Sequence, residues 1–195
     1  SPRAFGNQKW LLINIMKIGI IGSGNMGRSL GILWAECGHE VFFGARNAQK
    51  GQQVAEFAGL NTQGGTNDEA AKFGDVLLYT IRGVNPAEVL SSIALLDNKI
   101  LIDCNNFEIP ENFAYPPIVK SLAEKLAEEA PNALVVKAFN TMGQEVFELA
   151  PEPLKDYGVS VFVASDDEVA RKTVMQLANE IGFAAVDCID TTRLS

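Results

Sequence analysis

The sequence predicts an α/β fold in which a doubly wound, mostly parallel sheet carries helices on both of its faces. Apolar stretches of strand length alternate with amphipathic stretches of helix length along the chain, a pattern typical of parallel sheets joined by crossover helices. The first strand, Lys17–Gly22, is a run of branched apolar residues, as expected for a strand buried on both faces. No internal repeat interrupts the pattern, so we expect a single domain in the 195-residue chain.

The predicted elements follow from local apolar runs, helical spacing and turn residues. The predicted strands are Lys17–Gly22, Glu40–Gly44, Asn61–Gln63, Asp75–Ile81, Lys99–Cys104, Ala133–Phe139, Val159–Ala164 and Phe183–Cys188. The predicted helices are Asn25–Cys37, Asn47–Gly59, Asn67–Phe73, Asn85–Ile93, Pro116–Ala130 and a last helix that ends at Gly182.

Helical spacing of apolar residues defines the buried faces of the longer helices. In the first helix this face consists of Leu30, Leu33, Trp34 and Cys37, and Gly38 suits the position after its end. In the second helix we expect Val54, Phe57 and Ala58 to point inward. In the helix predicted over 116–130 the apolar stripe is Ile118, Val119, Leu122 and Leu126.

Specific residues mark where the other helices begin and end. Pro86 is acceptable in the first turn of the helix over 85–93. Pro131 ends the helix predicted over 116–130, and Ser165–Glu168 reads as a capping box that opens the last helix.

The composition excludes several classes of function. Sixteen Lys and Arg residues against 24 Asp and Glu residues give a net charge of −8, which disfavours nucleic acid and anionic membranes because both attract positive proteins. The run Trp10–Ile21 is too short and too interrupted to span a bilayer. The chain has three cysteines, an odd number, and no two of them lie at the short spacing of a metal site, which argues against a disulfide framework and a zinc site. The single histidine, His39, argues against histidine-rich metal sites and histidine-based triads. We therefore expect a reduced, cytoplasmic protein without a metal, and His39 at the helix–strand turn is expected to be a structural capping residue.

A glycine motif follows the first strand and opens the first helix. The string Gly22-Ser23-Gly24-Asn25-Met26-Gly27 has the Gly-x-Gly-x-x-Gly spacing, and its place between a buried strand and a helix makes the match specific. Gly22 permits the turn, Gly24 lets backbone amides approach a pyrophosphate, and Gly27 allows close packing of helix on strand. The helix N-terminus adds a positive dipole for phosphates. We expect a bound dinucleotide in a Rossmann-type domain.

The end of the second strand favours NADP over NAD. An NAD site places Asp or Glu there to hold the ribose 2′-hydroxyl, but no carboxylate occurs from Val41 to Gly51. Arg46, flanked by Ala45 and Asn47, can instead clamp a phosphate with its planar guanidinium, and Lys50 lies one helical turn later.

Other strand ends supply candidate contacts in the crevice where open parallel sheets bind ligands. The fourth strand ends in Thr80, Ile81 and Arg82, which are candidates for the wall around the nicotinamide ribose. The fifth and sixth strands end in neutral polar residues, and turn chemistry is the competing explanation for each. These residues are Asn105, Asn106, Asn140 and Thr141. Nothing marks a catalytic acid, base or nucleophile, and Cys104 has no activating neighbour.

Several strings together resemble one family. Met16–Gly27, Gly38–Val41, Gly44–Asn47, Val135–Thr141 and Asp166–Glu168 are similar to the F420-dependent NADP reductase family over nearly the whole chain. The resemblance implies a Rossmann-type reductase that passes hydride between NADPH and the deazaflavin coenzyme F420, and a cytosolic homodimer. The cytosolic oxidoreductase domains of membrane ferric reductases are similar as well.

The resemblance also implies roles for individual residues. The phosphate loop corresponds to Ser23, Gly24, Asn25 and Met26, and the 2′-phosphate site to Arg46 and Lys50. The nicotinamide pocket corresponds to Ile81 and Ala138, and the stretch facing the deazaflavin to Asn140, Thr141, Met142 and Gly143. Phe107 departs from the family pattern, which often has proline there.

The sequence leaves the electron acceptor open. We expect hydride transfer between NADPH and F420, with a flavin or a ferric acceptor as the alternative. Hydride transfer between two rings needs close approach and exclusion of water rather than an acid or base. A non-catalytic NADP(H)-binding redox sensor would carry the same motifs. In domain terms, residues 1–15 are expected to be an extension or tag remnant, and 16–195 an NADP-binding domain with a C-terminal strand–helix–strand annex.

Overall fold

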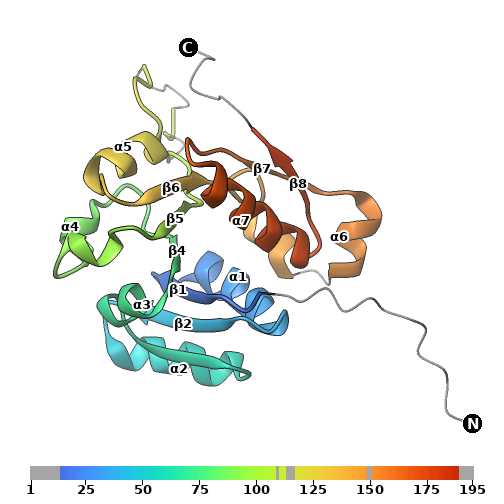
Figure 1. Cartoon of the computed structure of the whole chain (residues 1–195), viewed down its shortest axis with the longest axis horizontal. Coiled ribbons are helices and arrows are strands. Elements are labelled where there is room, and N and C mark those ends of the chain that lie inside the picture. Colours follow the sequence, from blue (N-terminus) through green and yellow to red (C-terminus); the bar gives the residue numbers. More distant parts are fainter. Residues whose placement is uncertain (1–13, 109, 113–116, 149–150, 189–195) are drawn as a thin grey trace, which may run out of the picture.

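A computed structural model describes residues 14–108, 110–112, 117–148 and 151–188 of the chain (Figure 1). The expected N-terminal extension over residues 1–15 lies outside the described residues apart from its last two, Asn14 and Ile15. The end of the expected annex, from residue 189, lies outside them as well.

The described elements alternate between strand and helix, as predicted. The strands are β1 (Lys17–Ile21), β2 (Glu40–Ala45), β3 (Thr62–Thr66), β4 (Val76–Tyr79), β5 (Ile100–Asp103), β6 (Leu134–Lys137), β7 (Ser160–Val163) and β8 (Ala184–Asp187). The α-helices are α1 (Asn25–Glu36), α2 (Ala48–Ala58), α3 (Asn67–Phe73), α4 (Pro86–Val89), α5 (Leu122–Glu129), α6 (Pro151–Tyr157) and α7 (Glu168–Glu180). Two short 3-10 helices are η1 (Ile93–Leu96) and η2 (Gln144–Glu148).

A six-stranded parallel sheet has the order β3-β2-β1-β4-β5-β6. From β1 the chain proceeds outward through β2 and β3, and then returns to the other side of β1 for β4, β5 and β6. Residue Ile21 pairs with Gly44 on one side and with Tyr79 on the other, so these strands end level with one another. The reversal of strand order therefore lies between the carboxyl ends of β1 and β4, which confirms the predicted Rossmann-type fold.

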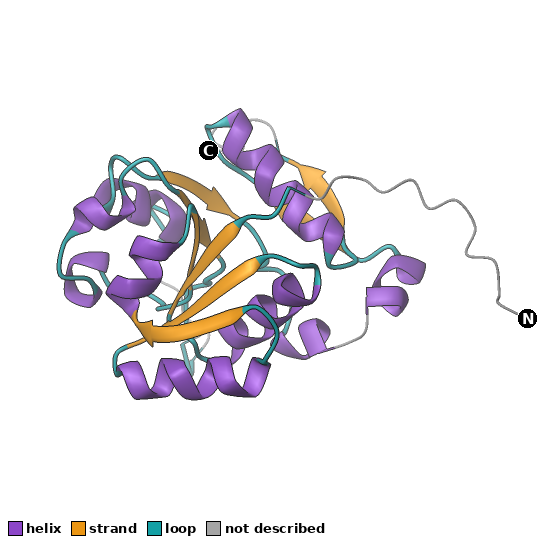
Figure 2. Cartoon of the chain, turned by 60° about the horizontal axis from the view of Figure 1, so that its bottom comes forward, coloured by secondary structure: helices purple, strands orange, loops and turns teal. Residues whose placement is uncertain are grey.

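The predicted strand–helix–strand annex follows this sheet. Strands β7 and β8 form a separate two-stranded parallel sheet with α7 between them in sequence. A single antiparallel bridge between Lys137 and Ala164 joins the annex to the edge of β6. Helices lie on both sides of the large sheet (Figure 2).

The large sheet is buried on both faces by two hydrophobic clusters. One face carries Ile18 and Ile20 of β1 and packs against α1 and α7, whereas the other carries Ile21 and packs against α3, α4, η1 and α5. Residues Val76–Tyr79 of β4 alternate between the two clusters in the same way. Burial on both faces explains why these strands read as continuous apolar runs rather than as alternating ones.

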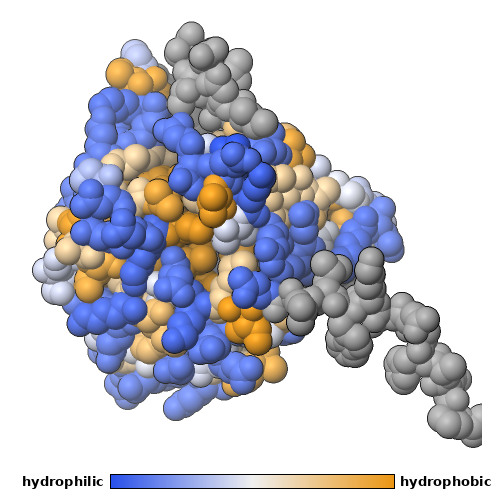
Figure 3. Space-filling model, viewed as in Figure 1, coloured by the Kyte–Doolittle hydropathy of each residue, from blue (hydrophilic) through white to orange (hydrophobic). Residues whose placement is uncertain are grey.

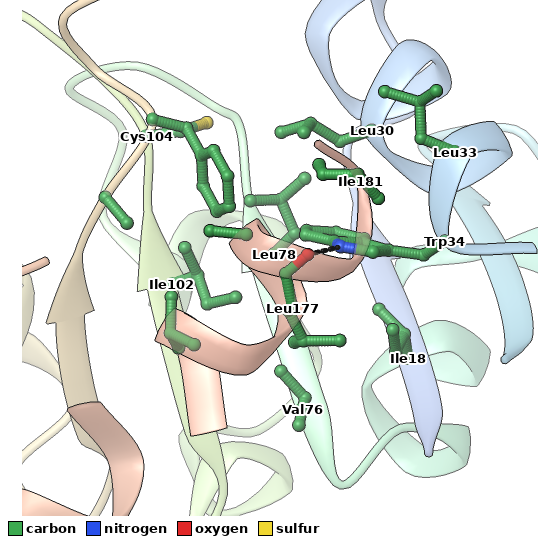
Figure 4. Close-up of a cluster of buried hydrophobic side chains, with 14 of the residues drawn as sticks. Ile18, Leu30, Leu33, Trp34, Val76, Leu78, Ile102, Cys104, Leu177 and Ile181 are labelled. Atoms are coloured by element: carbon green, nitrogen blue, oxygen red, sulfur yellow. Dashed lines mark hydrogen bonds between the residues drawn. The ribbon is translucent and has the colours of Figure 1, made fainter. Parts of the chain in front are cut away.

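The end of α1 is attached to the end of α7. The indole Nε1 of Trp34 donates to the carbonyl of Leu177 at 3.2 Å (Figure 4). The fully buried His39 accepts from the backbone N–H of Met16 through Nδ1 at 3.1 Å. Its Nε2 must therefore carry the hydrogen, and it lies 2.6 Å from Oε2 of Glu180. His39 stands at the predicted turn, but its ring joins three parts of the chain rather than only capping a helix.

One residue of the face expected to be buried in α2 is exposed. Val54 and Ala58 are partly buried against the core as expected, but Phe57 is 74% exposed, with the Arg28 guanidinium over its ring at 5.7 Å. The buried residues of α2 are the small Gly51 and Ala55, because Gly51 packs directly against the backbone of β3.

The helix expected over 116–130 is shorter than predicted, and residue 116 lies outside the described residues. Helix α5 begins at Leu122 because Ser121 and Glu124 form a capping box. As a result, Ile118 and Val119 precede the helix and are exposed.

The cap of the last helix also differs from the prediction. Asp167, not Ser165, caps α7 by accepting from the N–H of Ala170 at 2.7 Å. The hydroxyl of Ser165 instead donates to the carbonyl of Val135 at 2.6 Å, which attaches the annex to β6.

Replacing Gly51 with alanine is expected to lower the free energy of unfolding by about 1–3 kcal/mol, as for other overpacked sites. An added Cβ would lie 2.2 Å from the carbonyl oxygen of Gly65 in β3. This clash should outweigh the roughly 1 kcal/mol that alanine contributes inside a helix. Urea unfolding measures the effect, with the exposed neighbour Gln52→Ala as control. A Gly51→Ala protein as stable as the wild type would contradict the close packing of α2 on β3.

On the molecular face seen in Figure 3, hydrophilic residues surround smaller groups of hydrophobic ones. No helix in the described part of the chain is long and apolar enough to cross a membrane.

Candidate functional site

Two cavities lie along the carboxyl edge of the sheet, on either side of the point where strand order reverses. The first, of about 720 Å³, is here called the β1–β2 pocket because the exits of these strands line it. The second, of about 710 Å³, is called the β4–β6 pocket for the same reason. Open parallel sheets bind ligands at this position.

The glycine loop forms one wall of the β1–β2 pocket and is fixed by neighbouring strands. Gly22 has φ +94°, a conformation that favours glycine, and its N–H donates to Oδ1 of Asn67 at 3.1 Å. The N–H and hydroxyl of Ser23 both donate to the carbonyl of Gly44, at 2.9 and 2.7 Å. Ser23 therefore holds the loop against β2 with both of its donors.

The backbone N–H groups at the start of α1 are the hydrogen-bond donors of this loop that have no partner among the described residues. Gly24 is the N-cap residue, and no side chain caps the helix. The first N–H groups of a helix have no partner within it, so those of Gly24, Asn25 and Met26 are available to an anion. A Cβ added to Gly24 would meet nothing within 4 Å. This open space over an uncapped helix N-terminus fits a pyrophosphate.

Basic side chains form another part of the β1–β2 pocket. Arg46 and Lys50 are exposed and line it, and among the described residues neither takes part in a salt bridge. Ala45 lines the pocket too, and Asn47 caps α2 by accepting from the N–H of Gln49 at 2.8 Å. Unpaired cations beside a helix N-terminus are unfavourable without an anion, so the pocket suits a phosphate group.

The β4–β6 pocket has a mixed lining of neutral polar groups, apolar side chains and one charged residue of each sign, Arg82 and Glu108. It is lined by Met26, Thr80, Arg82, Gly83, Cys104, Asn105, Asn106, Phe107, Glu108, Leu122, Asn140, Met142 and Gly143. The hydroxyl of Thr80 donates to the carbonyls of Ile21 and Gly22, which ties the end of β4 to the glycine loop. Met26, at the start of α1, borders this pocket just beyond the loop that forms the wall of the other.

Hydrogen bonds between side chains hold the exits of β5 and β6 together. Nδ2 of Asn106 donates to the carbonyl of Asn140, and Nδ2 of Asn140 donates to Oδ1 of Asn106 at 3.2 Å. Behind them, Nζ of Lys137 lies 2.8 Å from the buried carboxylate of Asp103. Asp103 also accepts from the backbone and side-chain nitrogens of Asn105, at 3.0 and 2.9 Å. This network fixes the wall of the β4–β6 pocket.

The thiol of Cys104 borders the same pocket without being reactive. Burial, with a smaller contribution from the negative charge of Asp103, raises the pKa of the Cys104 thiol to about 12. The thiol therefore stays protonated at neutral pH and is no nucleophile. Among the described residues no group of three or more His, Cys, Asp or Glu side chains could hold a metal.

The structure brings most of the expected site residues to the two pockets, with differences of placement. Ile81 lines the β1–β2 pocket rather than the β4–β6 pocket. Asn25, Ala138 and Thr141 are absent from the lining of both, and the side chain of Ala138 is fully buried in the core.

Sequence reasoning missed several residues that line the pockets. In the β1–β2 pocket these are Asn67, Val84, Glu88 and Val89. In the β4–β6 pocket they are Gly83, Phe107, Glu108 and Leu122. A signal for Asn67 was available, because it directly follows β3 at the same carboxyl edge.

Replacing Lys137 with methionine is expected to lower the free energy of unfolding by about 3 kcal/mol, because an unpaired buried carboxylate is costly. Asp103 is 2% exposed and would lose its cation. In a urea double-mutant cycle, adding Asp103→Asn should recover part of this loss. Lys172→Met, which breaks an exposed pair with Glu168, is the control and should change nothing measurable. Strictly additive effects of the two changes would contradict the coupling.

Comparison with known proteins assigns the chain to a family. Residues 17–107 match the family model described as NADP oxidoreductase, coenzyme F420-dependent. The F420-dependent NADP reductase of Methanothermobacter marburgensis is 30% identical over 193 residues, which are 89% of this chain and 84% of the relative. The chain belongs to the F420-dependent NADP reductase family. This family consists of NADP-dependent oxidoreductases, and its matched region includes the glycine loop and the basic residues after β2.

Two further likenesses extend the comparison. A crystal structure from Arthrobacter sp. FB24, assigned to the F420-dependent NADP reductases, superposes with a TM-score of 0.77 at 25% identity, covering 91% of this chain and 86% of that one. Human metalloreductase STEAP2 is 32% identical over 171 residues, which are 87% of this chain. The chain spans 32% of the length of that relative, so the likeness concerns about a third of it.

Proposed function

We propose that the protein binds NADP(H) in the β1–β2 pocket and transfers hydride between the nicotinamide and a flavin-like acceptor in the β4–β6 pocket, with coenzyme F420 as the first candidate acceptor. The observation that carries the proposal is the pair of cavities of similar size, about 720 and 710 Å³, at the point where strand order reverses. The first presents an uncapped helix N-terminus and the unpaired cations Arg46 and Lys50, and the second presents amide and hydroxyl groups beside apolar side chains.

Different residues of the β1–β2 pocket would bind different parts of the dinucleotide. The amides of Gly24, Asn25 and Met26 would receive the pyrophosphate, because they are the free donors of α1. Arg46 and Lys50 would bind the 2′-phosphate that distinguishes NADP from NAD. The bound cofactor supplies the hydride.

Residues of the β4–β6 pocket would position two rings rather than transfer protons. Thr80 fixes the loop at the boundary between the pockets, and the hydrogen-bonded Asn106 and Asn140 hold the opposite wall. The side chains of Met26 and Met142 offer apolar surface to a ring. Hydride transfer between rings needs approach to roughly 3–3.5 Å and a site without water. The fixed walls would set the approach of the two rings, and the apolar side chains of the two methionines would help to displace water.

A flavin or ferric acceptor is the second candidate. It is favoured by the 32% identity to human metalloreductase STEAP2, whereas F420 is favoured by the relatives named F420-dependent NADP reductase that the chain matches over most of their length. A ferric acceptor accepts single electrons, so a carrier such as a flavin would have to divide the hydride.

The test is oxidation of NADPH by the purified protein, followed by the loss of the absorbance of reduced nicotinamide. The acceptor panel is F420, FMN, FAD, a ferric chelate and no acceptor. We expect turnover with F420 well above turnover with the others. Turnover with flavin or iron alone would establish the second candidate instead, and NADPH binding without any turnover would identify a redox sensor.

Location and assembly complete the proposal. We infer a homodimer in the cytoplasm, where the free thiols of Cys37, Cys104 and Cys188 would stay reduced. Sedimentation equilibrium tests the dimer, and a monomer at micromolar concentration would overturn it.

A further inference from the structure

We propose that Asn67 is an additional cofactor-binding residue, whose carboxamide oxygen fixes the glycine loop while its nitrogen donates to the bound dinucleotide. The inference rests on the proposed function, because it assigns a further donor to the same β1–β2 pocket. Asn67 lines this pocket and is 6% exposed.

The orientation of the carboxamide follows from its partner. The atom that faces Gly22 accepts a backbone N–H at 3.1 Å, so it must be the oxygen and not the nitrogen. Among the described residues no group accepts from the Asn67 nitrogen, and no buried polar side-chain atom there is left without a partner. The nitrogen is therefore not fully enclosed by protein, and it belongs to a side chain that lines the β1–β2 pocket.

The position of Asn67 is rigid and close to the phosphate-binding groups. Its helix, α3, is closed at the start by a capping box in which Thr66 and Glu69 exchange hydrogen bonds. The Cα of Asn67 would lie 3.0 Å from a Cβ added to Gly44, the residue whose carbonyl also holds Ser23. The side chain thus lies between the glycine loop and the end of β2, where a dinucleotide would cross from one to the other.

The charges around this position suit an anion. The same pocket contains the cations of Arg46 and Lys50, with Glu88 as the carboxylate in its lining. A neutral donor at residue 67 adds a hydrogen bond to an oxygen of the pyrophosphate or of a ribose, which NADPH and NADH share, without adding charge. An aspartate there would keep the acceptor for Gly22 but would place a negative charge in the pocket, which separates the two roles.

The experiment compares Asn67→Ala and Asn67→Asp with the wild type in two measurements. Titration of protein fluorescence gives the dissociation constants of NADPH and NADH, and NMR hydrogen exchange without cofactor reports the protection of the Gly22 amide. Asn67→Ala should weaken both dinucleotides about tenfold, the value of one lost hydrogen bond in a binding site, and should expose the Gly22 amide. Asn67→Asp should leave that amide protected and weaken both dinucleotides at least as much.

Asn85→Asp is the matched control. Asn85 also accepts a backbone N–H at the start of a short helix, from Ala87 at 2.8 Å, but it lines neither pocket. It should bind NADPH as the wild type does.

The outcomes separate the inference from the proposed function. Wild-type affinity in Asn67→Asp, or exposure of its Gly22 amide, would overturn the inference, and so would a loss confined to NADPH. If the wild type itself fails to bind NADPH, the proposed function fails first.

Discussion

Gly24→Val is expected to abolish binding of NADPH and NADH alike while leaving the protein folded. A side chain at this position would extend from the uncapped N-terminus of α1 into the space where the pyrophosphate must approach. Nothing in the protein lies within 4 Å of the added Cβ, and the φ of −72° is acceptable for any residue. The loss should exceed a hundredfold, because the helix donors contribute to every dinucleotide. Fluorescence titration measures binding, and thermal unfolding checks the fold.

A pair of alanine variants in the same loop provides the control. Gly24→Ala should weaken binding with little effect on unfolding. Gly27→Ala should unfold more easily, because its Cβ would lie 2.5 Å from the carbonyl oxygen of Gly22. Undiminished NADPH binding by Gly24→Val would show that the phosphates lie elsewhere.

Arg46→Ala is expected to weaken NADPH about 10–100-fold and NADH hardly at all, as for the loss of charge-assisted hydrogen bonds. The guanidinium lines the β1–β2 pocket and has no acidic partner among the described residues. Its removal therefore frees no buried carboxylate and should not disturb the fold. The ratio of the two dissociation constants, measured at constant ionic strength, reports the effect directly.

Arg28→Ala is the control for a general loss of positive charge. Arg28 lies over the ring of Phe57 and lines neither pocket. It should leave the preference for NADPH unchanged. An equal loss of NADPH and NADH in Arg46→Ala would refute a 2′-phosphate contact and require another explanation for NADP preference.

The fold could be predicted from the sequence where strands are buried on both faces, because such strands are continuous apolar runs. The strands β1, β2, β4 and β5 lie within about two residues of their predicted bounds, since each is an apolar run between turn residues. Patterning failed for Phe57, Ile118 and Val119, which are apolar at helical spacing yet exposed. Spacing alone does not show that Gly51 packs directly on β3 or that Ser121 starts α5.

The residues of the candidate site could be predicted where they directly follow the carboxyl end of a strand. The exits of β1, β2, β4, β5 and β6 supplied most residues that line the two pockets. The missed part depends on contacts between distant segments. The hydrogen bond from Gly22 to Asn67 spans 45 residues, and Ile81 lines the same pocket as Arg46 although the two residues are 35 positions apart.

The attachment of α1 to α7 has a consequence for the order of folding. Trp34 and His39 find their partners about 140 residues later, at Leu177 and Glu180. Contacts of such separation form late, because a long loop must close first. During synthesis α1 therefore lacks these two contacts until the last helix has left the ribosome. If α1 binds the phosphates as proposed, the carboxyl-terminal annex, whose described residues line neither pocket, would determine when the nascent chain becomes competent to bind NADP(H).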